Sequence, residues 1–108
     1  MYLPSPLTFI MDESKLTTLI IKALRRKGGF WFKIHGSAYQ TSGIADIVGC
    51  YRGRFIALEV KIPGKERTLS KRQRLMLLRV RQHNGVSAVV TSTEAALEVI
   101  LSVDRELD

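Results

Sequence analysis

The sequence predicts an α/β fold in which helices pack on a small mixed β-sheet. Apolar residues recur at helical spacing in three segments, and four further segments read as short strands. Along the chain these segments give the order α, β, β, β, α, β, α, which is typical of a mixed sheet covered by helices. The 108 residues, 45% of them hydrophobic, suffice for one domain with one core.

The first predicted element is a helix over residues 13–27. Its apolar residues recur on one side, Asp12 is placed to cap its start, and the glycine pair after it ends it. The stretch "FWFKIHG", residues 30–36, then predicts a strand. The polar residues 37–43 favour a loop, because they supply no core and are common in turns.

Two strands follow, at 44–51 and 54–61. Apolar residues dominate both, and Arg52 and Gly53 between them predict a tight hairpin turn. Because the turn sets the register, it also decides which residues face each other across the pair.

The second half of the chain predicts a helix, a strand and a helix. After a basic loop, Ser70 caps a helix that runs to about Asn84 and is ended by Gly85. Residues 86–91 predict the fourth strand. A capping box of Thr91 with Glu94 opens the last helix.

The charge of the chain indicates its partner. The formal charge is +7, from 17 basic and 10 acidic residues, and the bases gather in "KALRRK", "KIPGKERTLSKRQR" and "LRVRQ". An extended polyanion such as nucleic acid is therefore expected, and a membrane surface is less favoured. A single cysteine, Cys50, excludes an intramolecular disulfide, and two histidines are too few for a His/Cys zinc cluster. We expect an intracellular, cytoplasmic protein.

The first eleven residues, "MYLPSPLTFIM", predict an extended arm ahead of a single domain at 12–108. Two prolines stand in the segment and no basic stretch precedes its apolar residues, so it reads as neither a signal peptide nor a transmembrane span. Two interpretations stay open. The arm is either an upstream extension of a chain whose folded part starts near Met11, or a clamp on a partner subunit.

Asp46, Glu59 and Lys61 interrupt the apolar residues of the predicted hairpin. With a two-residue turn, counting back along both strands places Asp46 opposite Glu59, with Cβ atoms about 4.5–5.5 Å apart. Like charges there destabilise a sheet, so a bound Mg²⁺ or Mn²⁺ is the simplest compensation. Lys61 is expected on the same face as Glu59. The alternative is a solvated face on which Glu59 pairs with Lys61 or Arg54 and nothing binds.

Asp46 followed by Glu59-Val60-Lys61 resembles the D…(D/E)xK signature of the PD-(D/E)xK nuclease superfamily. More narrowly, "GGFWFK", "GIAD", "LEVK" and the downstream Gln73, in that order, are similar to the stand-alone VRR-NUC proteins of phages and bacteria. The resemblance covers about residues 13–100. It implies a minimal restriction-endonuclease-like fold and Mg²⁺- or Mn²⁺-dependent cleavage of phosphodiester bonds.

The resemblance also implies residue roles. Asp46 and Glu59 would be metal ligands, and the backbone carbonyl of Val60 a further one. Lys61 would orient or activate the attacking water and offset charge on the phosphate. Gln73 matches the glutamine that follows the ExK strand in the family, and it begins a helical stripe where an apolar residue is expected. Its alternative is a simple polar residue at a helix start.

Two positions depart from the family pattern. Ala45 stands where the family usually has proline before its aspartate. The acid that relatives often carry in the first helix falls at Thr17 here, and Glu13, one turn earlier on the same stripe, is placed to replace it as a metal ligand. The alternative for Glu13 is an acid favourably placed in the first turn of a helix.

Polar and basic residues around the predicted site are expected to contact the nucleic-acid backbone without reading bases. They are Lys33, Ser37, Gln40, Lys65, Arg67, Lys71 and Arg72. A solvated surface is the alternative for these side chains. We expect Phe30 and Trp31 to lie in the core and not on a base-stacking surface.

Taken with the resemblance, the sequence predicts a metal-dependent DNA endonuclease acting on branched DNA such as four-way junctions, as a homodimer similar to Holliday-junction resolvases. The competing hypothesis is a non-catalytic nucleic-acid-binding protein that keeps the nuclease fold. The presence of Asp46, Glu59 and Lys61 favours cleavage, and the acid missing at Thr17 favours the binding protein.

Overall fold

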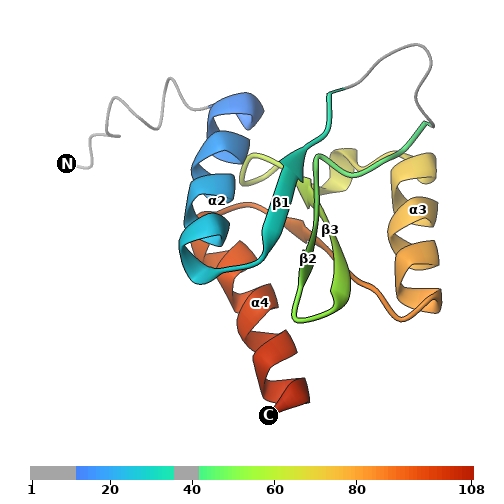
Figure 1. Cartoon of the computed structure of the whole chain (residues 1–108). Coiled ribbons are helices and arrows are strands. Elements are labelled where there is room, and N and C mark those ends of the chain that lie inside the picture. Colours follow the sequence, from blue (N-terminus) through green and yellow to red (C-terminus); the bar gives the residue numbers. More distant parts are fainter. Residues whose placement is uncertain (1–11, 36–41) are drawn as a thin grey trace.

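The computed structural model describes residues 12–35 and 42–108 and confirms the predicted α/β class. A mixed sheet of four strands lies between helices, as expected for a minimal restriction-endonuclease-like core (Figure 1). The strands lie in chain order, β1-β2-β3-β4, with the first two pairs antiparallel and the β3–β4 pair parallel. The predicted arm at 1–11 lies outside the described residues.

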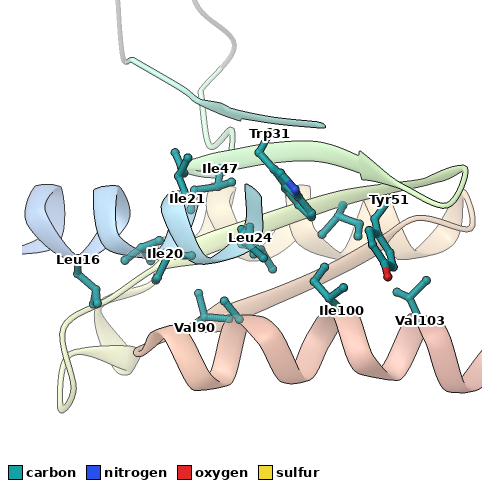
Figure 2. Packing of buried hydrophobic residues seen from close by; sticks show 14 residues of the cluster. Leu16, Ile20, Ile21, Leu24, Trp31, Ile47, Tyr51, Val90, Ile100 and Val103 are labelled. Carbon is teal, nitrogen blue, oxygen red and sulfur yellow. The ribbon is translucent and has the colours of Figure 1, made fainter. Parts of the chain in front are cut away.

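Helices α2 (Glu13–Lys27) and α4 (Thr93–Leu107) cover one face of the sheet, and their apolar sides form the main core with it (Figure 2). The side chain of Asp12 caps α2 as predicted, by accepting a hydrogen bond from the Lys15 N–H at 2.8 Å. No helix in the described part of the chain is long and apolar enough to cross a membrane.

Helix α3 (Lys71–Gln82) lies on the opposite face of the sheet. Its Leu77 packs with Ala45 and Ala57 in a second, smaller apolar cluster. The Ser87 hydroxyl of β4 (Val86–Val90) donates a hydrogen bond to the Leu77 carbonyl of α3 at 2.7 Å, and this bond holds the helix against the sheet. This cluster covers only part of the face.

Strands β2 (Ile47–Tyr51) and β3 (Arg54–Val60) form the predicted hairpin. Tyr51 lies opposite Arg54, so the predicted register is confirmed. The turn residues Arg52 and Gly53 both have positive φ, 50° and 84°, as in the two-residue turns that match the twist of a hairpin.

Strand β1 (Phe30–Lys33) is an edge strand beside β2. Trp31 is buried, as predicted, and packs closely over Gly49. A Cβ atom at Gly49 would lie 2.5 Å from the Trp31 ring and 2.2 Å from the Phe30 carbonyl oxygen, so only glycine fits there. The prediction that Phe30 is also buried is wrong, because alternate residues of a strand face opposite sides and none of the described helices covers Phe30.

Several boundaries differ from the prediction. Strand β2 starts at Ile47 and not at residue 44, and β3 and β4 each end one residue earlier than predicted. Strand β1 ends at Lys33, and α3 ends at Gln82, two residues before Asn84. The predicted capping box of Thr91 and Glu94 is wrong: Ser92 caps α4, by accepting from the Ala95 N–H at 3.0 Å. Thr91 directly follows β4, and the helix starts one residue later than the pattern suggested.

Candidate metal centre

The predicted carboxylates lie at the end of the sheet where β3 ends, β2 begins and α3 starts (Figure 1). Asp46 precedes the first residue of β2, and Glu59 is the penultimate residue of β3. The last pair of the ladder is Ile47 with Leu58, so the same register places Asp46 opposite Glu59. The hairpin therefore brings the two acids together as the sequence predicted.

Glu59 is a buried carboxyl, with an exposed fraction of only 2%. Its Oε2 accepts a hydrogen bond from Gln73 Nε2 at 3.0 Å, whereas its Oε1 is buried without a hydrogen-bond partner among the described residues. Burial, followed by the neighbouring Asp46 carboxyl, raises the pKa of Glu59 to about 8; Lys61 acts in the opposite direction. The alternative of a solvated sheet face is therefore wrong.

Asp46 is held by backbone groups of both neighbouring strands. Its Oδ2 accepts from the Val60 N–H at 2.8 Å, and its carbonyl accepts from the Ile34 N–H at 2.8 Å. Because the N–H and C=O of one strand residue point to the same side, the Val60 carbonyl also faces the Asp46 side. The three oxygen donors that the resemblance implied thus belong to one fixed segment of the sheet.

Gln73 is positioned by the start of α3. The Gln73 N–H donates to Ser70 Oγ at 3.1 Å, and Gln73 Oε1 accepts from the Ser70 N–H at 2.9 Å, which together form a capping box. Since the amide oxygen is engaged by Ser70, the amide nitrogen points to Glu59. We predicted Ser70 as a cap and Gln73 as a site residue; the S-x-x-Q spacing at 70–73 was the signal that links them.

Lys61 follows the last residue of β3 and is 7% exposed. Its backbone N–H donates to the Val90 carbonyl at 3.0 Å, so the parallel neighbour β4 fixes its position. It forms no ion pair with any residue that the structure describes. Its charge acts on Glu59, and because no described acid pairs with it, the ammonium remains available to a bound group.

The first helix contributes a charge to the site. Glu13, in the first turn of α2, is exposed, and its negative charge is the smallest of the causes that raise the pKa of Glu59. Thr17 is buried, and its hydroxyl donates to the Glu13 carbonyl at 2.7 Å. Thr17 is thus satisfied within its own helix, and the role of Glu13 as a metal ligand stays a prediction.

The oxygen donors fit a hard divalent cation. Among residues 12–35 and 42–108, no three Asp, Glu, His or Cys side chains gather closely enough to hold a metal by themselves. Two carboxylates and a carbonyl leave positions for water and phosphate, which is how Mg²⁺ usually binds in nucleotide sites. The free, buried Oε1 of Glu59 is the structural observation that supports this fit.

The predicted backbone-contacting residues divide into two groups. Lys65, Arg67, Lys71 and Arg72 are exposed between the end of β3 and the first turn of α3, around the short helix η1 (Glu66–Thr68). Lys33 instead donates to Ser14 Oγ at 3.1 Å, at the start of α2. Ser37 and Gln40 lie outside the described residues.

Comparisons of the chain with family models, with curated proteins and with solved structures found no match. The functional assignment therefore depends on the motifs and on the geometry of this centre.

Proposed function

We propose that the protein is a Mg²⁺- or Mn²⁺-dependent endonuclease of the VRR-NUC type that hydrolyses phosphodiester bonds in DNA. The observation that carries the proposal is the buried Glu59, whose Oε1 has no partner among the described residues, beside Asp46. A purely structural acid so deeply buried would have both carboxyl oxygens hydrogen-bonded, because an unsatisfied buried polar group destabilises the fold.

Each residue of the centre has a role in this reaction. Asp46, Glu59 and the Val60 carbonyl would hold the cation, which when bound activates water and stabilises charge on the phosphate. Lys61 orients the attacking water and offsets charge on the phosphate oxygens. Gln73 fixes the orientation of Glu59 through the hydrogen bond to Oε2.

The distribution of charge favours a polyanionic substrate on the α3 side. Helix α3 carries five basic residues and no acidic residue, whereas α4 carries four acids and one base. Bases near the centre, including Lys71 and Arg72, form no ion pair with a described residue. Arg72 donates to Ser42 Oγ at 3.1 Å, but its charge is not neutralised by a described acid, so both bases can bind phosphates.

The proposal extends to branched DNA and to a cytoplasmic homodimer. One chain supplies one centre, and paired cuts across a four-way junction require two centres at a fixed spacing, which a two-fold dimer supplies. The arm at 1–11 and the exposed Leu101 of α4 offer apolar material for an interface. Light scattering over micromolar concentrations measures this assembly directly.

A non-catalytic nucleic-acid-binding protein is the second candidate. The observation that favours it is Thr17, whose hydroxyl is engaged within α2 where relatives often carry an acid. The two candidates differ in one measurable property, metal-dependent cleavage, and share the other, binding in EDTA.

The test uses labelled single-stranded, duplex, flap and four-way-junction DNA with Mg²⁺ or Mn²⁺. Wild type should cut at least one substrate, and Glu59→Gln and Asp46→Asn should reduce the rate at least about a hundredfold, because each removes a ligand charge. Glu98→Gln, at an exposed acid of α4, is the control. Binding in EDTA should be unchanged in all variants. Uncleaved substrates with normal binding would support the second candidate instead.

A further inference from the structure

Among residues 12–35 and 42–108, no element covers an aromatic face that lies on the same side of the sheet as α3. Phe30, Phe32 and Phe55 are 64%, 49% and 50% exposed. The register puts Phe30, Cys50 and Phe55 in one row across the three strands, so their side chains share a face. The Phe30 and Phe32 rings contact each other edge to face, with centroids 4.7 Å apart. We call these three side chains the aromatic face.

A groove of about 360 Å³ separates the aromatic face from α3. It is lined by Val48, Phe55 and Ala57 of the sheet and by Met76 and Val80 of α3. All of its lining side chains are apolar, and they include Ala45, the neighbour of Asp46. The groove therefore leads from the aromatic face to the candidate metal centre.

The rows of the sheet set the distance between the aromatic face and the carboxylates. Phe32 pairs with Val48, which pairs with Ala57, and Glu59 is two residues further along β3. Two residues of a strand span about 7 Å and four span about 14 Å. Measured along β3, the row of Phe32 thus lies about 7 Å from Glu59, and the row of Phe55 about 14 Å. Both distances correspond to a few nucleotide steps of a nucleic-acid chain.

Basic side chains border this apolar surface. Arg79 and His83 line a second hollow of about 310 Å³ together with Phe55. From Arg67 to Thr93 the chain contains no acidic residue, whereas half of its ten acids lie at or after Glu94. A protein partner or a second copy would be matched by an apolar face alone, but exposed rings with a basic border match a polyanion that also carries flat apolar groups.

We propose that the aromatic face stacks the unpaired bases of a single-stranded nucleic acid whose backbone then passes the candidate metal centre. Aromatic side chains on a sheet bind bases in this way without reading sequence, while basic neighbours hold the backbone. The inference rests on the proposed function for the course of the strand past Asp46 and Glu59. The stacking itself depends only on the exposed rings and their basic border.

The first test measures binding by fluorescence anisotropy in EDTA. Phe32→Leu and Phe55→Leu keep an apolar side chain but remove the ring, and Leu19→Ala, at an exposed apolar residue of α2, is the control. Each Phe variant should bind labelled oligothymidylate about 5- to 150-fold more weakly, the effect of one lost base stack, and duplex of equal length like wild type. Oligouridylate distinguishes RNA from DNA as the source of the bases. Unchanged binding of both oligonucleotides would overturn the proposal.

A second variant reports stacking directly and does not depend on loss of binding. Phe32→Trp places an indole on the aromatic face, whereas Trp31 is buried on the other side of the sheet. Emission from the new indole should be quenched on addition of oligothymidylate, and Leu19→Trp, on α2, should show no change. If the indole emission fell when the protein alone was concentrated but did not fall when oligonucleotide was added, the aromatic face would bind a second copy of the chain. That result would overturn the proposal.

These readouts separate the inference from the proposed function, because neither requires cleavage. If wild type cuts DNA but the rings are irrelevant to single-strand binding, the inference fails and the nuclease stands. If binding depends on the rings and no substrate is cut in Mg²⁺ or Mn²⁺, the nuclease fails and the stacking surface stands.

Discussion

Glu59 shows how one residue can be costly to the fold and useful to the site. Burial and the nearby Asp46 disfavour its charged form. In the absence of a cation the pKa of the carboxyl is therefore about 8, and it is mostly protonated at neutral pH. A divalent cation at the free Oε1 would favour the charged form instead. Protonation, metal binding and stability are therefore linked at this one side chain.

The first prediction concerns stability against pH in EDTA. The pKa of Glu59 in the folded state, about 8, is above its ordinary value of 4.5, so its contribution to stability is full below pH 4.5 and is lost as the pH rises to 8. The slope is at most about 1.4 kcal/mol per pH unit. Glu59→Gln cannot ionise, so it should flatten the curve and be more stable than wild type at pH 9. Urea denaturation at several pH values measures this.

The linkage between protonation and metal binding at Glu59 also predicts the effect of Mn²⁺. With Mn²⁺ present, wild type should regain stability at neutral pH while releasing about one proton on binding, which calorimetry in buffers of different ionisation enthalpy detects. Equal pH dependence of wild type and Glu59→Gln in EDTA would contradict the raised pKa of Glu59.

Lys61 supports a second prediction at this scale. Its positive charge favours the ionised form of Glu59 but opposes a cation bound there. Lys61→Met should therefore abolish cleavage while binding Mn²⁺ at least as tightly as wild type, measured by calorimetry. Lys27→Met, at a lysine that pairs with Asp104 of α4, should change neither property. Loss of Mn²⁺ binding in Lys61→Met would make the lysine a structural support of the centre.

At the scale of elements, the start of α3 connects helix stability to the site. Ser70 caps the helix through its hydroxyl, and Gln73 links that cap to Glu59. The start of α4 has a matching cap in Ser92, whose hydroxyl accepts from the Ala95 N–H of its own helix and makes no hydrogen bond to a site residue in the described part of the chain. Comparing substitutions of the two serines therefore distinguishes an effect on helix stability from an effect on the position of Glu59.

Ser70→Ala and Ser92→Ala should each lower the free energy of unfolding by about 0.5–2 kcal/mol, the usual loss for an N-cap. Only Ser70→Ala should also slow cleavage, because Gln73 then loses one of its two box hydrogen bonds. Gln73→Ala should be less stable than either, since it also leaves Glu59 Oε2 buried and unpaired, which costs about 1–3 kcal/mol. Urea denaturation and a cleavage assay on the same preparations measure both. Equal cleavage by the two serine variants would contradict the link.

The elements also show what the sequence could and could not predict. A two-residue turn determines the register of the hairpin, so the meeting of Asp46 and Glu59 followed from counting residues. The sequence did not reveal that α3 stops short of the aromatic face, since the coverage of a face depends on where a helix packs. Phe30 was misplaced for this reason, while Trp31, one residue later on the other face, was predicted correctly.

Across the whole molecule, charge is divided between the two faces of the sheet, because α3 carries five bases and no acid whereas α4 carries four acids and one base. At the hairpin end, acids of α4 neutralise the nearby bases: Asp104 pairs with Lys27 and Arg52, and Glu106 with Arg54 (Figure 1). The Arg52 hydrogen bond, first among several, lowers the pKa of Asp104 to about 2, so this pairing persists across the range in which nucleic acids bind. The excess positive charge is left on the α3 side.

This separation predicts which bases control the salt dependence of DNA binding. Each phosphate neutralised by a lysine or arginine releases counterions, so the logarithm of the affinity falls by about 0.9 per contact for each tenfold rise in salt. Arg72→Gln and Lys71→Gln, at the start of α3, should each reduce that slope by about one and weaken binding of all sequences alike. Arg105→Gln is the control, because Arg105 is exposed but pairs with Glu98 on α4. Anisotropy titrations in EDTA over a range of KCl concentrations measure the slopes. If Arg105→Gln lowered the slope as much as Arg72→Gln, the nucleic acid would lie over α4, away from the candidate centre and from the aromatic face.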